Sequence, residues 1–145
     1  MSQIRPPKDS NKPNPRKGVA ANKILARLRS ICLSLPNAYE EAAWAGTRWM
    51  IRKRNFAHVV EIVNGWPPAY ARAAASGGPV VVLTVRTSPE LADVLRNAAP
   101  RFFYAPWGTR WGTKVIGIKL QGRIDWPEVE TLIAESYRLL APRSK

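Results

Sequence analysis

The sequence contains little cysteine, little histidine and few acidic side chains. One cysteine and one histidine in 145 residues, Cys32 and His58, exclude a disulfide framework and a Cys/His zinc site, since tetrahedral zinc needs three or four such ligands. No stretch approaches the roughly 18 apolar residues of a membrane-spanning helix, and the N-terminus lacks the apolar segment of a signal peptide. We therefore expect a soluble, cytoplasmic protein that binds no metal and no cofactor and makes no membrane contact.

The shortage of acids leaves a large positive charge, because 23 Lys and Arg oppose 10 Asp and Glu, a net +13. Such a balance favours polyanionic partners, above all nucleic acid. Residues 1–17 contribute 5 − 1 = +4, so residues 18–145 keep 13 − 4 = +9. Residues 1–17 also hold four prolines and almost no apolar side chains, which predicts a flexible basic tail before a single domain at 18–145.

The apolar pattern predicts three helices and five strands. Apolar residues at steps of three and four, each run ending at a proline, predict helices at 19–35, 87–99 and 125–141. Thr87 and Asp125 each stand three residues before a glutamate, the spacing of a capping box. Runs of β-branched and aromatic residues with period two predict strands at 47–52, 56–63, 79–86, 101–104 and 113–120. The predicted class is α+β in the order α-β(3)-α-β(2)-α, with a short helical turn at 70–75.

Groups that could carry catalysis are scarce. Cys32 lies on the apolar stripe of the first helix, and His58 alternates with Phe56, Val60 and Ile62 along one strand, so both are expected to be structural. The adjacent Glu40 and Glu41 point in different directions and form no carboxylate pair. The segment 108–114 resembles a phosphate-binding loop, but it is too short and leads into a strand. We therefore do not expect an enzyme.

Basic and aromatic residues alternate at two predicted hairpin tips, 52–55 and 101–114. Lys and Arg neutralise phosphates, and exposed flat rings stack on bases, so this combination is typical of nucleic-acid-binding surfaces. Phe102 and Phe103 are better explained by packing of the sheet against its helices, and basic tips also protect sheet edges. The candidate nucleic-acid-binding residues are Arg48, Arg52, Lys53, Arg54, Trp107, Arg110, Trp111 and Lys114.

Several segments resemble the MmcQ/YjbR-like family over about residues 20–143. They are 34–41 after the first helix, Phe56-Ala57 at the start of a strand, 115–120, 125–129 and 135–142, of which the closing Ser136-Tyr137-Arg138-Leu139 with the preceding Asp125-Trp126 is the most specific. The resemblance implies a two-layer sandwich with an antiparallel sheet, of the secretion-chaperone-like type. It also implies non-enzymatic DNA binding through a double wing formed by the two hairpins.

The chain departs from the family pattern at two places. Relatives often carry a His and a Trp at the start of the last strand, where this chain has Lys114-Val115 and an earlier Trp111, and its loop 64–78 is long. A low-specificity DNA-binding protein, associated with the nucleoid, is the first expectation. A protein-interaction module is the alternative, with an apolar partner surface formed by Trp44, Trp49, Trp66, Trp107 and Trp111. A small-molecule pocket beside residues 64–78 is a third possibility.

Overall fold

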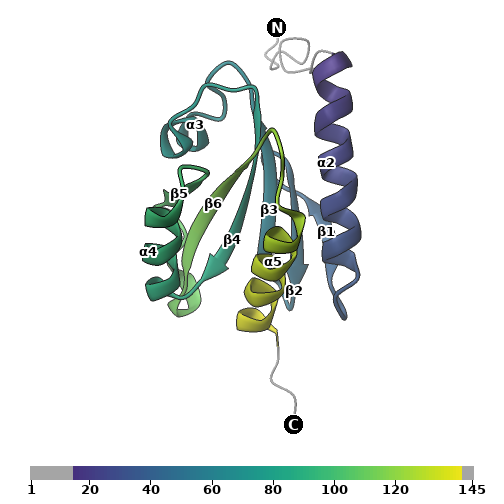
Figure 1. The fold of residues 1–145 in the computed structure, drawn as a ribbon. Coiled ribbons are helices and arrows are strands. Elements are labelled where there is room, and N and C mark those ends of the chain that lie inside the picture. Colours follow the sequence, from purple (N-terminus) through teal and green to yellow (C-terminus); the bar gives the residue numbers. More distant parts are fainter. Residues whose placement is uncertain (1–14, 142–145) are drawn as a thin grey trace, which may run out of the picture.

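The structure, a computed structural model, describes residues 15–141 (Figure 1). Its elements in chain order are α2 (Pro15–Leu33), β1 (Tyr39–Ala42), β2 (Thr47–Ile51), β3 (Arg54–Ile62), α3 (Pro68–Ala74), β4 (Val80–Thr87), α4 (Pro89–Ala98), β5 (Phe102–Ala105), the 3-10 turn η1 (Arg110–Gly112), β6 (Lys114–Leu120) and α5 (Trp126–Leu140). In residues 15–141 no helix is long and apolar enough to cross a bilayer.

The strands form one six-stranded sheet in the order β1-β2-β3-β4-β6-β5, and every neighbouring pair is antiparallel. The predicted α+β class and the order α-β(3)-α-β(2)-α are confirmed. Two elements go beyond the prediction: α3 is a helix of 7 residues, and β1 is a strand of 4 residues at the sheet edge. Strand β1 lacks the expected apolar alternation because its centre is Glu40-Glu41, on an edge where only one side pairs.

The predicted boundary between tail and domain falls inside a helix. Residues 1–14 of the predicted tail lie outside the described residues. Helix α2 begins at Pro15, three residues before the expected start of the domain at residue 18. Proline is favoured in the first turn of a helix, because its missing N–H has no partner there in any case.

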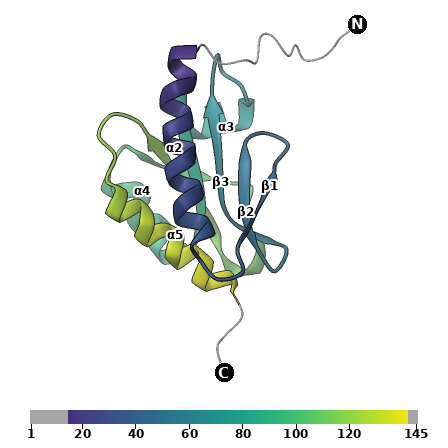
Figure 2. The same ribbon diagram turned by 90° about the vertical axis from the view of Figure 1, so that its right-hand side faces the viewer.

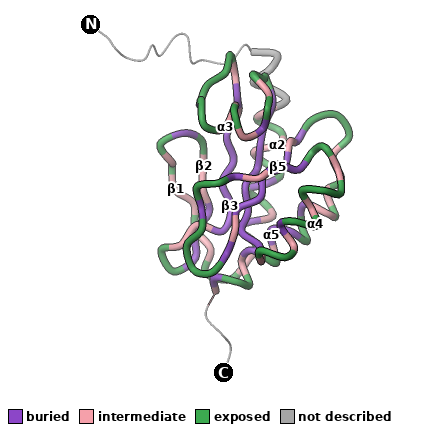
Figure 3. The backbone as a smooth tube through the Cα atoms, turned by 90° about the vertical axis from the view of Figure 1, so that its left-hand side faces the viewer, coloured by how far each residue is buried: buried purple, intermediate pink, exposed green. Residues whose placement is uncertain are grey.

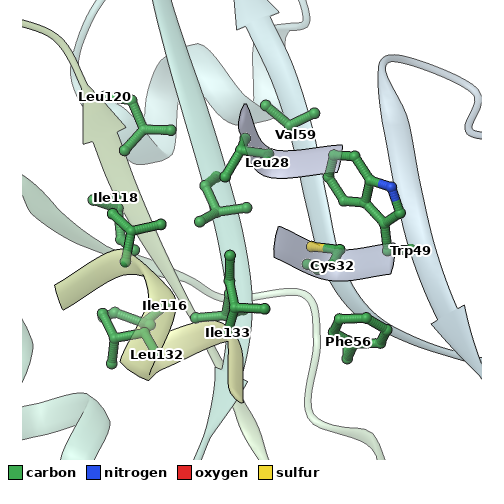
Figure 4. Packing of buried hydrophobic residues seen from close by; sticks show 14 of the residues in the cluster. Leu28, Cys32, Trp49, Phe56, Val59, Ile116, Ile118, Leu120, Leu132 and Ile133 are labelled. Carbon is green, nitrogen blue, oxygen red and sulfur yellow. The ribbon is translucent and has the colours of Figure 1, made fainter. Parts of the chain in front are cut away.

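The larger hydrophobic core lies between the sheet and helices α2, α4 and α5 (Figure 2). Leu28 and Cys32 of α2 are fully buried and face Trp49 of β2 (Figure 4). Burial raises the pKa of the Cys32 thiol, which makes it an inert core residue, as its place on the apolar stripe predicted. Trp49 is also fully buried, so it cannot belong to an exposed partner surface as the alternative hypothesis required.

Only half of the opposite face of the sheet is covered (Figure 3). Helix α3 packs on Val80 and Val82 of β4, together with Val60, Ile62 and Phe103 of neighbouring strands. Side chains of one strand alternate between faces, so Thr84 and Arg86 follow Val80 and Val82 on the same face. They lie beyond α3, on the part of this face that no helix within residues 15–141 covers.

The two helix starts are capped, but one of them differs from the predicted motif. Ser88, not Thr87, caps α4 and accepts a hydrogen bond from the Leu91 amide, because Thr87 still belongs to β4. Asp125 caps α5 as predicted and accepts from the Glu128 amide. The Glu128 carboxylate does not complete a capping box, since it pairs with Arg101 at 2.8 Å.

The ladder between β3 and β4 ends at Ala57–Val85, beside a bulge of β3 against β2, and α5 bonds to the backbone groups just beyond it. Trp49 pairs with Ala57 but Met50 pairs with Asn55, which leaves Phe56 without a partner on β2. The Ser136 hydroxyl, fully buried, donates to the Phe56 carbonyl at 2.6 Å and accepts from the Arg86 amide at 2.9 Å. One side chain therefore satisfies a backbone group on each strand. The bulge also corrects the predicted alternation, because Phe56 lies in the core under α2 and α5 whereas His58 faces the other side.

Replacing Ser136 with alanine leaves both of these backbone groups buried and unpaired. We expect Ser136→Ala to lower the free energy of unfolding by about 2 kcal/mol, measured by urea denaturation. Thr131→Ala is the matched control, because Thr131 also bonds to a carbonyl, that of Pro127, but at an exposed position of the same helix. Its effect should stay below about 0.5 kcal/mol. Equal losses in the two variants would contradict the bridging role of Ser136.

Candidate functional site

The uncovered half of the sheet is the floor of a cleft of about 340 Å³. Strands β3 and β4 form the floor, and the β2–β3 turn and the β5–β6 loop form the walls. Four cationic side chains line it, Arg48, Lys53, Arg86 and Arg110, and none of its lining residues is Asp or Glu. The charge of the cleft lining is therefore positive, which favours anions.

Arg86 lies at the floor of this cleft with only 8% of its surface exposed. Its Nε donates to the Asn55 carbonyl, its Nη2 to the Asn55 side-chain oxygen and its Nη1 to the Thr113 hydroxyl, each at 3.2 Å. Within residues 15–141 no carboxylate forms an ion pair with it. Burial, with a smaller contribution from the charge of Arg110, lowers the pKa of Arg86. A buried cation held by neutral groups alone is costly, and an incoming anion would offset that cost.

The β5–β6 loop reaches the β2–β3 turn through Trp111. The guanidinium carbons of Arg54, Arg86 and Arg110 lie 5.1, 4.5 and 5.9 Å from the centre of the Trp111 ring. Attraction between each cation and the ring holds three like charges in one place. Trp111 adopts a φ of 59° to reach this position, a conformation unusual for a bulky residue. The two predicted tips are therefore not separate, because they meet over one indole.

Lys53 projects from a two-residue turn at one rim of the cleft. The turn is Arg52-Lys53, between the paired residues Ile51 and Arg54, so β3 begins two residues earlier than predicted. Both turn residues have positive φ, 52° and 65°, as hairpin turns of type I′ require and as glycine or asparagine would adopt more easily. Each such residue costs about 1 kcal/mol. Two basic side chains thus occupy positions where stability alone would favour Asn-Gly.

A chain of hydrogen bonds fixes the wall on the α3 side. The Ala45 carbonyl can only accept, so His58 Nε2–H donates to it at 2.6 Å, and Nδ1 of the neutral ring accepts from the Tyr70 hydroxyl at 2.9 Å. Burial lowers the pKa of His58, against a smaller opposite effect of its hydrogen bond to Ala45, and the nearby charge of Arg48 lowers it further. Burial raises the pKa of Tyr70 to about 12, against a smaller opposite effect of its hydrogen bond from Trp107. The Trp107 ring packs on Tyr70 at 4.7 Å.

Five of the eight predicted binding residues line the cleft: Arg48, Lys53, Trp107, Arg110 and Trp111. Arg54 joins them through the Trp111 ring, and Arg52 is exposed beside Lys53 in the turn. Arg48 is partly neutralised by Glu41, at 2.7 Å.

Lys114 stands apart from this group. It pairs with Thr87 at the start of β6, and its Nζ lies 2.7 Å from the Tyr104 hydroxyl. Strand alternation places it with Ile116 and Ile118 on the helix-covered face, opposite the cleft. The catalytic pairing of His58 with Cys32 is also not formed, because the two residues lie on opposite faces of the sheet.

Sequence reasoning missed Arg86 and Tyr70 as cleft residues. Arg86 was only the end of a Val-rich strand. The sequence did contain a signal for Arg86. It follows Val80 and Val82 at steps of two, so strand alternation puts its charged side chain on the same face as these buried valines, where a cation is unusual. Tyr70 carried no comparable signal, because the path of the loop 64–78 depends on tertiary packing.

Comparisons with known proteins identify a sequence family and a similar solved structure. Residues 33–139 match the family model described as YjbR, which includes every cleft residue named above. Among solved structures, the crystal structure of a Pseudomonas syringae protein from a structural genomics consortium is similar, with a TM-score of 0.60. The two sequences are 17% identical, and the match covers 79% of this chain and 96% of that chain. At this identity the likeness concerns the fold alone. No curated protein matches.

The state of His58 predicts a pH dependence of stability. Its folded-state pKa lies below the ordinary 6.5, so as pH falls below about 6.5 the unfolded chain binds a proton that the folded protein does not. The free energy of unfolding should therefore decrease with falling pH, by at most about 1.4 kcal/mol per pH unit.

Urea denaturation between about pH 7 and pH 5.5 measures this slope. His58 is the sole histidine, so His58→Gln should remove the slope in this range even if it lowers stability throughout. Identical slopes in the parent protein and the variant would show that burial does not keep the His58 ring neutral in the folded protein.

Proposed function

The chain belongs to the YjbR family, and we propose that it is a non-enzymatic DNA-binding protein whose DNA contact is the cleft between the β2–β3 turn and the β5–β6 loop. The observation that carries the proposal is the charge of this cleft. Four cations from two strands, a turn and a loop converge there, no acid lines it, and the deepest of them, Arg86, has no counterion among the described residues. The proposed role requires no chemical step.

The dimensions favour a single strand over a duplex. A volume of about 340 Å³ is that of a pocket for one small molecule, and a duplex cannot enter it. Trp107 and Trp111 are 42% and 39% exposed at its walls, which leaves part of each ring for stacking on a base. Lys53 in the β2–β3 turn and Arg110 in the β5–β6 loop lie on two walls of the cleft, where they would contact phosphates of an entering strand.

Low sequence specificity follows from the side chains available. Reading a base edge requires free amide, carboxylate or guanidinium groups, and in this proposal the guanidinium groups of the cleft bind phosphates. The Asn55 amide oxygen is engaged by Arg86, and the aromatic rings stack on any base. Affinity would therefore come from phosphates and stacking.

A second surface favours a protein partner instead. Trp44 and Trp66 are 81% and 41% exposed, and their rings lie 5.5 Å apart. Paired exposed tryptophans are typical of protein contact sites. Salt separates the two functions, because binding to a polyanion weakens steeply as ionic strength rises, whereas aromatic contacts change little.

Charge removal at the rims tests DNA binding. Lys53→Ala and Arg110→Ala should each weaken binding of a single-stranded oligonucleotide and reduce the slope of log K against log salt by about 0.7, the value for one phosphate contact on a single strand. Fluorescence anisotropy at several salt concentrations measures both quantities.

Arg123→Ala is the matched control for this experiment. It removes the same charge from an exposed position in the loop after β6, at the end of the strand that lies away from the cleft. Its slope should be unchanged. Equal effects of the three variants would mean that net charge alone attracts DNA, and binding without any salt slope would favour the protein partner.

A further inference from the structure

We propose, as an extension that rests on the DNA-binding function, that the cleft recognises the terminal phosphate of a DNA strand in preference to the phosphates within it. A terminal phosphate is a phosphomonoester, which carries about −1.5 to −2 charges at neutral pH and three strong acceptor oxygens. A phosphate within the strand carries a single negative charge. The two groups therefore differ in charge and in the path by which they can reach the floor.

The charge of the floor fits the monoester. Arg86 uses three of its five N–H groups on Asn55 and Thr113, which leaves two donors for a ligand. Arg110 lies close enough to depress the pKa of Arg86, and Lys53 lines the same cleft. Three cations that line one cleft are poorly matched by a single negative charge and better matched by two.

Access to the floor fits a strand end as well. Arg86 exposes only 8% of its surface, and Trp107, Gly108 and Trp111 line the same cleft. Gly108 approaches the sheet so closely that a Cβ atom there would lie 2.2 Å from the Val115 side chain and 3.6 Å from Arg86 Nη1. The β5–β6 loop therefore packs closely against the floor of the cleft. An internal phosphate would need the chain to enter and leave through this space, whereas an end needs a single path.

The test compares three single-stranded oligonucleotides of one sequence with an internal fluorophore. One carries a 5′-phosphate, one a 3′-phosphate, and one has hydroxyl groups at both ends. We expect one of the phosphorylated strands to bind at least tenfold more tightly than the hydroxyl strand, and the difference identifies the end. Equal affinities of all three strands would overturn the terminal-phosphate proposal while leaving DNA binding intact. Failure of all three to bind would overturn the DNA-binding function itself.

Variants locate the preference in the cleft. Arg86→Lys keeps the charge but loses the fork of N–H donors, and it should reduce the preference to less than threefold. Arg86 is buried, so its substitution can also disturb folding, and Arg110→Ala and Lys53→Ala are therefore tested at exposed positions of the cleft. Each should reduce the preference for the phosphorylated strand, whereas Arg123→Ala should leave it unchanged. An undiminished preference in all three cleft variants would contradict the proposal.

Competition separates the sources of the phosphate. Deoxyadenosine 5′-monophosphate or its 3′ isomer should displace the preferred strand, and deoxyadenosine should not. Displacement by deoxyadenosine at equal concentration would mean that stacking alone directs binding and would overturn the proposal. Displacement by inorganic phosphate as effectively as by the nucleotide would assign the site to a free anion and would equally overturn recognition of a strand end.

Discussion

The cleft depends on one hydroxyl group, that of Ser136. Where β3 bulges at Phe56, the ladder between β3 and β4 stops, and Ser136 satisfies the carbonyl of one strand and the amide of the other. The strands can therefore diverge without leaving buried polar groups unpaired. Their divergence turns Asn55 toward Arg86, and two hydrogen bonds hold the guanidinium at the floor. A serine of the last helix thus helps to position the buried arginine of the cleft.

Charge is distributed so that three of the four cations of the cleft have no acidic partner among the described residues. Most ion pairs of the described residues lie on the helical side or at the β1 edge, such as Arg29 with Glu40 and Arg101 with Glu128. Exposed pairs of this kind each contribute at most about 1 kcal/mol. Their larger effect is to neutralise arginines away from the cleft. The unpaired cations Lys53, Arg86 and Arg110 then dominate the field that an approaching anion meets.

The sequence predicted the class, the element order and five of the residues that line the cleft, because these follow from apolar period and from the local mixture of basic and aromatic residues. It did not predict β1, which has a polar edge, or the bulge at Phe56, which shifts the alternation of β3 by one residue. The bulge decides which face Phe56 occupies, whereas His58 stays in phase with Val60 and Ile62. Lys114 was grouped with the loop because of its neighbours in sequence, although the strand turns it to the other face. The local sequence pattern could not reveal which face of the sheet a residue occupies after a bulge, or which strand residues a helix distant in sequence contacts.

The central claim is that the ligand enters the cleft beside Arg86, and NMR of side-chain N–H groups tests it most directly. In a titration with single-stranded DNA, the guanidinium signals of Arg86 and Arg110 and the indole signals of Trp107 and Trp111 should shift together. Signals of Arg101 and Trp126, on the helical side, should remain in place. Shifts confined to that side, with the Arg86 signal unchanged at saturation, would contradict the account.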